Sequence, residues 1–207
     1  MLDFFLKSYK NAPTTQILLE TIAFIFGIAS VWYAKKQNIL VYPTGIVATI
    51  ITSFLLFQAG YLGDMCINAY FTIMSFYGWL LWSRTNAESD LLPITITSLQ
   101  EKKIGILLFV LTIFVVLSIY KFFHYPLKTD NYIDVFTSGL FFTAMWYMAR
   151  KKLENWILWI VGDIIVVPLY AYRGLGILAL QYFIFTILAI TAYIEWKKNL
   201  HSTKPIF

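Results

Sequence analysis

One aspartate, Asp163, interrupts an apolar run from Trp156 to Tyr172 that is long enough to cross a membrane. If the run is a helix, Trp156, Trp159 and Asp163 lie at i, i+3 and i+7 and share one face. About 1.5 Å per residue then places the carboxylate roughly 10 Å from Trp156, inside the hydrocarbon layer. Because a carboxylate facing lipid is costly there, we expect Asp163 to face the protein interior. Two indoles and a carboxylate on such a face suit a flat organic cation.

A second polar stripe lies in the third apolar segment of the chain. Asn68, Thr72, Ser75 and Trp79 follow one another at spacings of 4, 3 and 4, which places them on one helix face. We expect Asn68, Ser75 and Trp79 to line the same site, with Gln181 of the last apolar segment as a further hydrogen-bonding contact. The alternative for Asn68 and Ser75 is helix packing, because small polar residues often join membrane helices.

Several residues near the ends of the apolar segments have a structural interpretation beside a functional one. Trp156 begins its segment, so it also suits an anchor at the lipid headgroups, and Trp82, next to Arg84, is expected to be such an anchor. Glu20 and Asp134 lie near the outer ends of their segments. They are either merely solvated or attract a cation to the outer mouth of the site.

The composition indicates an integral membrane protein. Apolar residues are 59% and charged residues 13% of the chain, against about 45–50% and about 25% in a soluble domain. Mean hydropathy is +0.70. The single cysteine, Cys66, excludes an internal disulfide, and the spacing of His124 and His201 gives no metal site. The start of the chain lacks a basic region and a cleavage pattern, so no removable signal peptide is expected, and no cofactor is expected either.

Seven apolar segments position these residues, each about long enough to cross a bilayer. Eleven of the 16 basic residues fall on one side if the N-terminus is outside and the C-terminus inside, and the positive-inside rule favours that orientation. The net charge of +5 therefore follows from topology and gives no reason to expect nucleic-acid binding. The segments cover about 17–34, 39–60, 65–83, 104–120, 132–149, 156–172 and 175–196.

The chain also contains a candidate internal repeat. Residues 57–63 (FQAGYLG) align with 170–176 (YAYRGLG) at a shift of 113, and the same shift aligns Asn68 with Gln181. We therefore expect a single transmembrane domain over residues 1–207, made of two parallel three-helix repeats. Repeat one covers about 17–83, a linker helix about 104–120, and repeat two about 132–196. Such repeats are typical of transporters with a site near the midplane.

Three strings resemble the PnuC family of bacterial inner-membrane vitamin transporters. They are residues 154–163 (ENWILWIVGD), 77–84 (YGWLLWSR) and 148–151 (MARK). The resemblance runs from about residue 17 to 198. It implies a 3+1+3 helix arrangement similar to the SWEET sugar carriers, and facilitated diffusion of nicotinamide riboside, with thiamine carried by relatives.

The resemblance implies ligand contacts at Trp156 and Trp159, while three neighbouring positions differ in chemistry. Riboside carriers typically have asparagine where this chain has Asp163, glutamine at the position of Asn68, and asparagine at the position of Ser75. Nicotinamide riboside and thiamine are both aromatic cations that would stack on indoles. A full negative charge at Asp163 keeps thiamine open as the alternative substrate.

The sequence thus predicts an all-α, multi-pass protein of the bacterial inner membrane that binds an aromatic vitamin cation and transports it by alternating access. A homo-oligomer, proton coupling through Asp163 and a purely structural subunit remain alternatives. An enzyme is not expected, because no second close carboxylate, membrane histidine or serine–base pair accompanies Asp163.

Overall fold

The fold is a bundle of long helices that follow the seven apolar segments closely. The structure, a computed structural model, describes residues 13–58, 62–83, 92–124 and 126–202. Each predicted segment lies within a few residues of a helix, and the largest differences are the earlier start of α5 and the later end of α8. The helices are α2 (Thr14–Lys35), α3 (Val41–Gln58), α4 (Leu62–Ser83), α5 (Leu99–Phe122), α6 (Thr129–Ala149), α7 (Asn155–Tyr172) and α8 (Gly176–Ser202).

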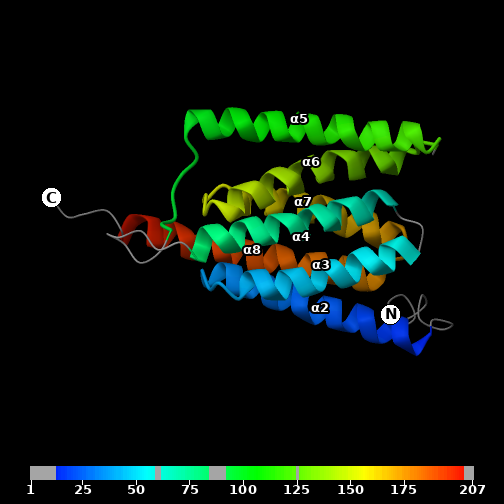
Figure 1. Cartoon of the computed structure of the whole chain (residues 1–207), viewed down its shortest axis with the longest axis horizontal. Helices are drawn as coiled ribbons and strands as arrows, with labels where there is room; N and C mark the ends of the chain where they lie inside the picture. Colours follow the sequence, from blue (N-terminus) through cyan, green and yellow to red (C-terminus); the bar gives the residue numbers. More distant parts are fainter. Residues whose placement is uncertain (1–12, 59–61, 84–91, 125, 203–207) are drawn as a thin grey trace.

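The helices pack as two groups of three. Within the first group α3 lies between α2 and α4, and within the second α7 lies between α6 and α8. The groups meet through two pairs, α2 with α8 and α4 with α6, and successive helices run in opposite directions (Figure 1). If α2 corresponds to α6 and α4 corresponds to α8, the α2–α8 pair is the counterpart of the α4–α6 pair. The contacts between the two groups therefore have a two-fold pattern, and the internal repeat in the sequence stays a prediction.

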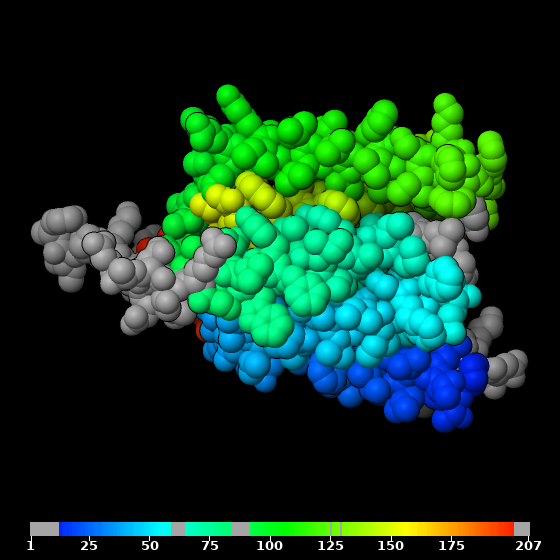
Figure 2. Space-filling model, in the orientation of Figure 1, coloured from blue at the N-terminus to red at the C-terminus, as the bar shows by residue number. Residues whose placement is uncertain are grey.

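Helix α5 stands apart from the two groups. It packs along α6, touches α4 only slightly and forms one long side of the molecule (Figures 1 and 2). Its outer side is apolar, with Leu107 64% and Phe114 68% exposed. Five helices, α2, α3, α5, α7 and α8, are long and apolar enough to cross a membrane by length and composition. An exposed apolar side on such a helix is suited to lipid.

The connection between α4 and α5 is anchored to the start of α7. The Thr95 amide donates to the Lys151 carbonyl, and the Leu153 amide donates to the Thr95 carbonyl. The Glu154 carboxylate accepts hydrogen bonds from the amide and the hydroxyl of Thr97, at 3.0 and 2.7 Å. These bonds fix the first turn of α7, so the side chains that follow along α7 have a defined depth and direction.

The interpretation of Trp82 as a headgroup anchor is wrong. Its side chain is buried, with 4% exposed, and its indole N–H donates to the Ala149 carbonyl at 3.1 Å. It also packs edge-on against Tyr42, with ring centroids 5.1 Å apart. Position near a helix end does not distinguish a tryptophan that faces lipid from one that faces a neighbouring helix.

Glu20 and Asp134, the two acidic residues predicted near the outer helix ends, have protein partners. Asp134 and Asp130 of α6 both bind the guanidinium of Arg173, which follows α7, with N–O distances of 2.6 and 2.7 Å. Asp134 is therefore neither merely solvated nor a free charge at the outer mouth. Glu20 accepts a hydrogen bond from the Gln16 amide at 2.8 Å. The ion pairs of Arg173 tie the turn after α7 to the start of α6.

Candidate functional site

Helix α7 concentrates buried polar atoms that lack partners. Among the described residues, the buried side-chain atoms without a hydrogen-bond partner include Trp156 Nε1, Trp159 Nε1 and Asp163 Oδ1. Asp163 is 2% exposed and Trp156 is 1% exposed, so both face the protein interior. Unsatisfied buried polar groups are rare in native proteins because each costs free energy. Three of them at i, i+3 and i+7 on one helix mark this face as the candidate binding site.

The indole of Trp159 is packed between aromatic rings of two other helices. Phe141 of α6 stacks on it, with ring centroids 5.2 Å apart and an interplanar angle of 25°. Phe71 of α4 approaches at 5.9 Å in a tilted arrangement. Gly162, next to Asp163, makes room for Phe141, because a Cβ atom at position 162 would overlap the Phe141 ring. Flat rings therefore surround the indole on the side where α4, α6 and α7 meet.

Trp156 lies deeper in the protein than a headgroup anchor would. Its ring packs edge-on against Trp196 of α8, with centroids 5.4 Å apart and an interplanar angle of 89°. With 1% of the side chain exposed, the alternative interpretation of Trp156 as a lipid anchor is wrong. Burial leaves its N–H available only to a partner inside the molecule.

Helix α8 places two neighbouring residues in different surroundings, Gln181 against α2 and Tyr182 against rings of α6 and α7, so a ligand role for Gln181 stays a prediction. The Gln181 amide nitrogen lies 3.0 Å from the position that a Cβ atom would take at Gly27 of α2. Tyr182 stacks on Phe141, with centroids 6.1 Å apart, and also contacts Tyr170 of α7 at 5.2 Å. The absence of a side chain at Gly27 thus lets α2 and α8 approach closely beside the aromatic rings.

The residues predicted on α4 divide between two environments. Ser75 is buried, with 4% exposed, and its hydroxyl lies 3.7 Å from the position of a Cβ atom at Gly45 of α3. Asn68 is half-buried, and its carbonyl accepts the Thr72 hydroxyl, which is also 2.7 Å from the Thr49 hydroxyl of α3. These contacts join helices α3 and α4, as the packing alternative expects. A ligand role for Asn68 and Ser75 stays a prediction.

Trp79 lies on a more open part of α4 than the other predicted residues. Its side chain is 37% exposed, while Trp156 and Asp163 are almost fully buried. Its neighbour Gly78 instead faces inward, where a Cβ atom would overlap the Tyr42 ring. The structure therefore does not bring Trp79 into the buried face of α7, and its ligand role also stays a prediction.

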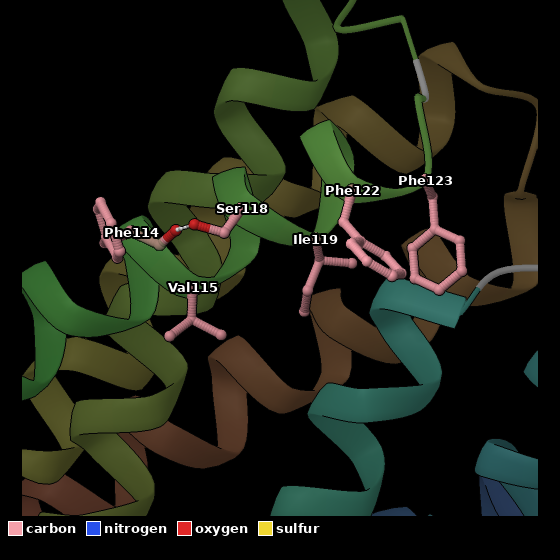
Figure 3. A pocket seen from close by; sticks show the side chains of 6 residues that line it. All are labelled: Phe114, Val115, Ser118, Ile119, Phe122 and Phe123. Atoms are coloured by element: carbon pink, nitrogen blue, oxygen red, sulfur yellow. Dashed lines mark hydrogen bonds between the residues drawn. The ribbon is translucent and has the colours of Figure 1, made fainter.

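A shallow hollow on α5 offers little ligand chemistry by comparison. Its one polar side chain, Ser118, already donates its hydroxyl to the Phe114 carbonyl at 2.8 Å (Figure 3). Within the described part of the chain, no group of three or more His, Cys, Asp or Glu residues is placed to hold a metal. The hollow is lined by Phe114, Val115, Ser118, Ile119, Phe122 and Phe123.

The chemistry of the α7 face suits a flat, electron-poor ring. An indole face attracts a cationic ring, a buried carboxylate offsets its charge, and two indole N–H groups donate to acceptor atoms. Sequence analysis missed Phe71, Phe141 and Tyr182, which complete the aromatic surroundings. Phenylalanine and tyrosine in an apolar helix carry no signal that separates a site from ordinary packing.

Known proteins resemble this chain over nearly its full length. The profile of the nicotinamide mononucleotide transporter family matches residues 17–198. The nicotinamide riboside transporter PnuC of Escherichia coli (strain K12) is 24% identical, over 86% of this chain and 84% of that protein. The riboflavin/roseoflavin transporter RibM of Streptomyces davaonensis is 20% identical, over 90% of this chain and 88% of that protein.

A solved structure shares the fold. The crystal structure of the vitamin B3 transporter PnuC superposes with a TM-score of 0.73, covering 98% of this chain and 91% of that one at 19% identity. The chain is accordingly an all-α, multi-pass membrane protein, and the resemblance to PnuC seen in its sequence motifs is confirmed. With the family profile matched from residue 17 to 198, the chain belongs to the nicotinamide mononucleotide transporter family.

Proposed function

We propose that this protein carries nicotinamide riboside across the plasma membrane of a bacterium by facilitated diffusion, without changing it chemically. Membership of the family and the names of the Escherichia coli and Shigella flexneri relatives support this assignment. The two three-helix groups, α2–α4 and α6–α8, would rock about the bound vitamin and open to one side at a time. This division makes residues 1–207 one transporter domain with α5 as the linker helix.

The observation that carries the proposal is the buried face of α7. Trp159 would stack on the nicotinamide ring, Asp163 would offset its positive charge, and the Trp156 N–H would donate to an oxygen of the ligand. Asp163 Oδ1 and the indole nitrogens of Trp156 and Trp159 lack hydrogen-bond partners among the described residues. Stacking on Trp159 would require the ligand ring to take the place that Phe141 or Phe71 holds beside the indole. Gln181, Asn68 and Ser75 are proposed to hydrogen-bond the polar groups of the vitamin.

Thiamine is the second candidate, because Asp163 stands where riboside carriers typically have asparagine. Thiamine and nicotinamide riboside are both aromatic cations, so the carboxylate attracts both, and it is the departure from the residue of the riboside carriers that supports thiamine. One relative is named a transporter of riboflavin, which is a neutral flat ring system. Comparing the binding of the two cations with that of riboflavin therefore shows whether the site selects for positive charge or for a flat ring.

Binding of nicotinamide riboside, thiamine and riboflavin to the purified protein, followed by tryptophan fluorescence quenching, tests the proposal. The proposal expects riboside binding, and Asp163→Asn should weaken binding of the cations by at least about tenfold while changing riboflavin binding little. Unchanged affinity for the cations in Asp163→Asn would remove the carboxylate from the site. Binding of thiamine alone would replace the riboside as substrate.

Flux into proteoliposomes tests the placement of the site separately. Trp159→Ala should abolish most of the flux, because it removes the stacking surface. The matched control is Trp32→Ala, since Trp32 lies on α2 with 48% of its side chain exposed. Undiminished flux in Trp159→Ala would contradict the placement.

A further inference from the structure

Two tryptophans make equivalent hydrogen bonds between the two helix groups. Trp82, at the end of α4, donates its indole N–H to the carbonyl of Ala149 at the end of α6. Trp196, near the end of α8, donates to the carbonyls of Ala34 and Lys35 at the end of α2, at 3.2 and 3.1 Å. Each bond therefore joins a helix of one group to a helix of the other.

The two bonds occupy similar places in the two helix groups, one position out of the shift of 113 that aligns residues 57–63 with 170–176. Trp82 and Trp196 are 114 positions apart, and so are their edge-on partners Tyr42 and Trp156. The Tyr42–Trp82 and Trp156–Trp196 rings have centroid distances of 5.1 and 5.4 Å, with interplanar angles of 83° and 89°. The two indoles also contact each other, with centroids 6.3 Å apart. The same device thus occurs once in each half, and the copies meet at the centre.

Charged side chains lie beside both bonds. Lys151 lies over the Trp82 ring, with its Nζ atom 4.5 Å from the centroid. Glu195, adjacent to Trp196, pairs with Lys36 at 2.9 Å and with Lys35 at 3.7 Å. Trp196 is fully buried and Trp82 is 4% exposed. Water therefore cannot replace the carbonyl as acceptor of either indole N–H unless the helices move.

We propose that Trp82 and Trp196 are paired latches that hold this end of the molecule closed, and that both bonds break when the site opens toward it. The inference rests on the proposed function, because alternating access is what requires one end to open. Helices α2, α4, α6 and α8 all end here, so rocking of the two groups separates both pairs of helix ends at once (Figure 1). With the predicted orientation, this is the cytoplasmic end.

Cysteine labelling in the purified full-length protein tests the latches without any vitamin. In a Cys66→Ser background, Ala192→Cys places a thiol one turn before Trp196, at a position with no exposed surface. Its reaction rate with a water-soluble maleimide reports opening of the latched end. Ala179→Cys, near the other end of α8 and 7% exposed, reports general loosening instead.

Trp82→Phe and Trp196→Phe keep an aromatic ring and remove the N–H donor. Each should raise labelling of Ala192→Cys about fivefold, since one net hydrogen bond of about 1 kcal/mol changes an equilibrium by that factor. Labelling of Ala179→Cys should stay unchanged, and Trp32→Phe at the same end should change neither. Glu195→Gln provides a milder variant, with an expected increase of about twofold, in case a Phe variant does not fold.

The outcomes separate the latches from the proposed function. The latch proposal would be overturned if Ala192→Cys were labelled at the same rate in the latch variants as in Trp32→Phe. It would also be overturned if labelling of Ala192→Cys and Ala179→Cys increased in parallel. Faster labelling confined to Ala192→Cys supports them. If that pattern appears while the unmodified protein neither binds nor transports any of the three vitamins, the proposed function fails and the latches stand.

Discussion

Phe141 stacks on Trp159 across the α6–α7 interface, and the ring fits there because residue 162 has no side chain. Trp159 carries an unpartnered indole N–H, and Asp163 follows Gly162 directly. The packing of one phenylalanine against a glycine therefore sets how close α6 lies to the proposed binding face. A change at either residue should act on stability and on ligand binding together.

Gly162→Ala should destabilise the protein by about 1–3 kcal/mol and weaken vitamin binding, because the added methyl group overlaps the Phe141 ring that stacks on Trp159. Thermal unfolding in detergent and fluorescence quenching measure the two effects. Phe141→Leu in the same chain should recover part of the stability, since a smaller side chain relieves the overlap. Additive effects of the two substitutions would show that the Gly162–Phe141 contact is not the cause.

Asp134→Asn should lower the melting temperature and leave vitamin affinity unchanged. The carboxylate belongs to an ion-pair network with Arg173 and Asp130, in which Arg173 is 22% and Asp134 18% exposed. Bidentate binding of an arginine by two carboxylates is the geometry in which an ion pair contributes measurably to stability. Glu20→Gln, near the outer end of α2, is the matched control and should change the melting temperature less. A weaker apparent affinity at low salt in Asp134→Asn alone would instead assign Asp134 to substrate attraction.

Stability should rise with pH between about 8 and 10.5 because of Lys151. Burial lowers the pKa of Lys151 from its ordinary value of 10.5 to about 8. Between these values the unfolded chain binds the proton and the folded chain does not, so a higher pH favours the folded state. Below about pH 8 both states are protonated, and the folded state carries the cost of a buried charge.

Lys151→Met should therefore stabilise the protein at pH 7 by up to about 3 kcal/mol. It should also remove the part of the rise in stability at alkaline pH that is due to Lys151. Melting temperatures of the variant and the unmodified protein from pH 6 to pH 10 measure the difference. Lys102→Met, an exposed position on α5, is the control and should follow the unmodified protein. A difference that does not depend on pH would contradict the role of the Lys151 charge.

The sequence predicts the helices better than it predicts what each side chain faces. Continuous apolar runs define the seven helices because the hydrocarbon layer requires uninterrupted helix. Asp163 is identified because a lone carboxylate in such a run needs an interior position. Trp82 and Trp156 were open to misinterpretation because indoles near helix ends suit headgroups and helix interfaces equally. Which of these applies depends on contacts from distant helices, α6 for Trp82 and α8 for Trp156.

The edge-on contact between Trp156 and Trp196 makes one residue part of both the proposed site and the proposed latch. Any ligand that shifts the Trp156 ring changes the free energy of the hydrogen bond made by Trp196. By thermodynamic linkage, breaking that hydrogen bond changes the affinity for the ligand. If the riboside loosens the latch by a given factor, opening the latched end must tighten riboside binding by the same factor. A carrier in which the two were tightly coupled would hold its cargo most strongly in the open state and release it slowly. Efficient delivery therefore favours a ligand that contacts Trp159 and Asp163 firmly and accepts the Trp156 N–H without shifting the indole ring.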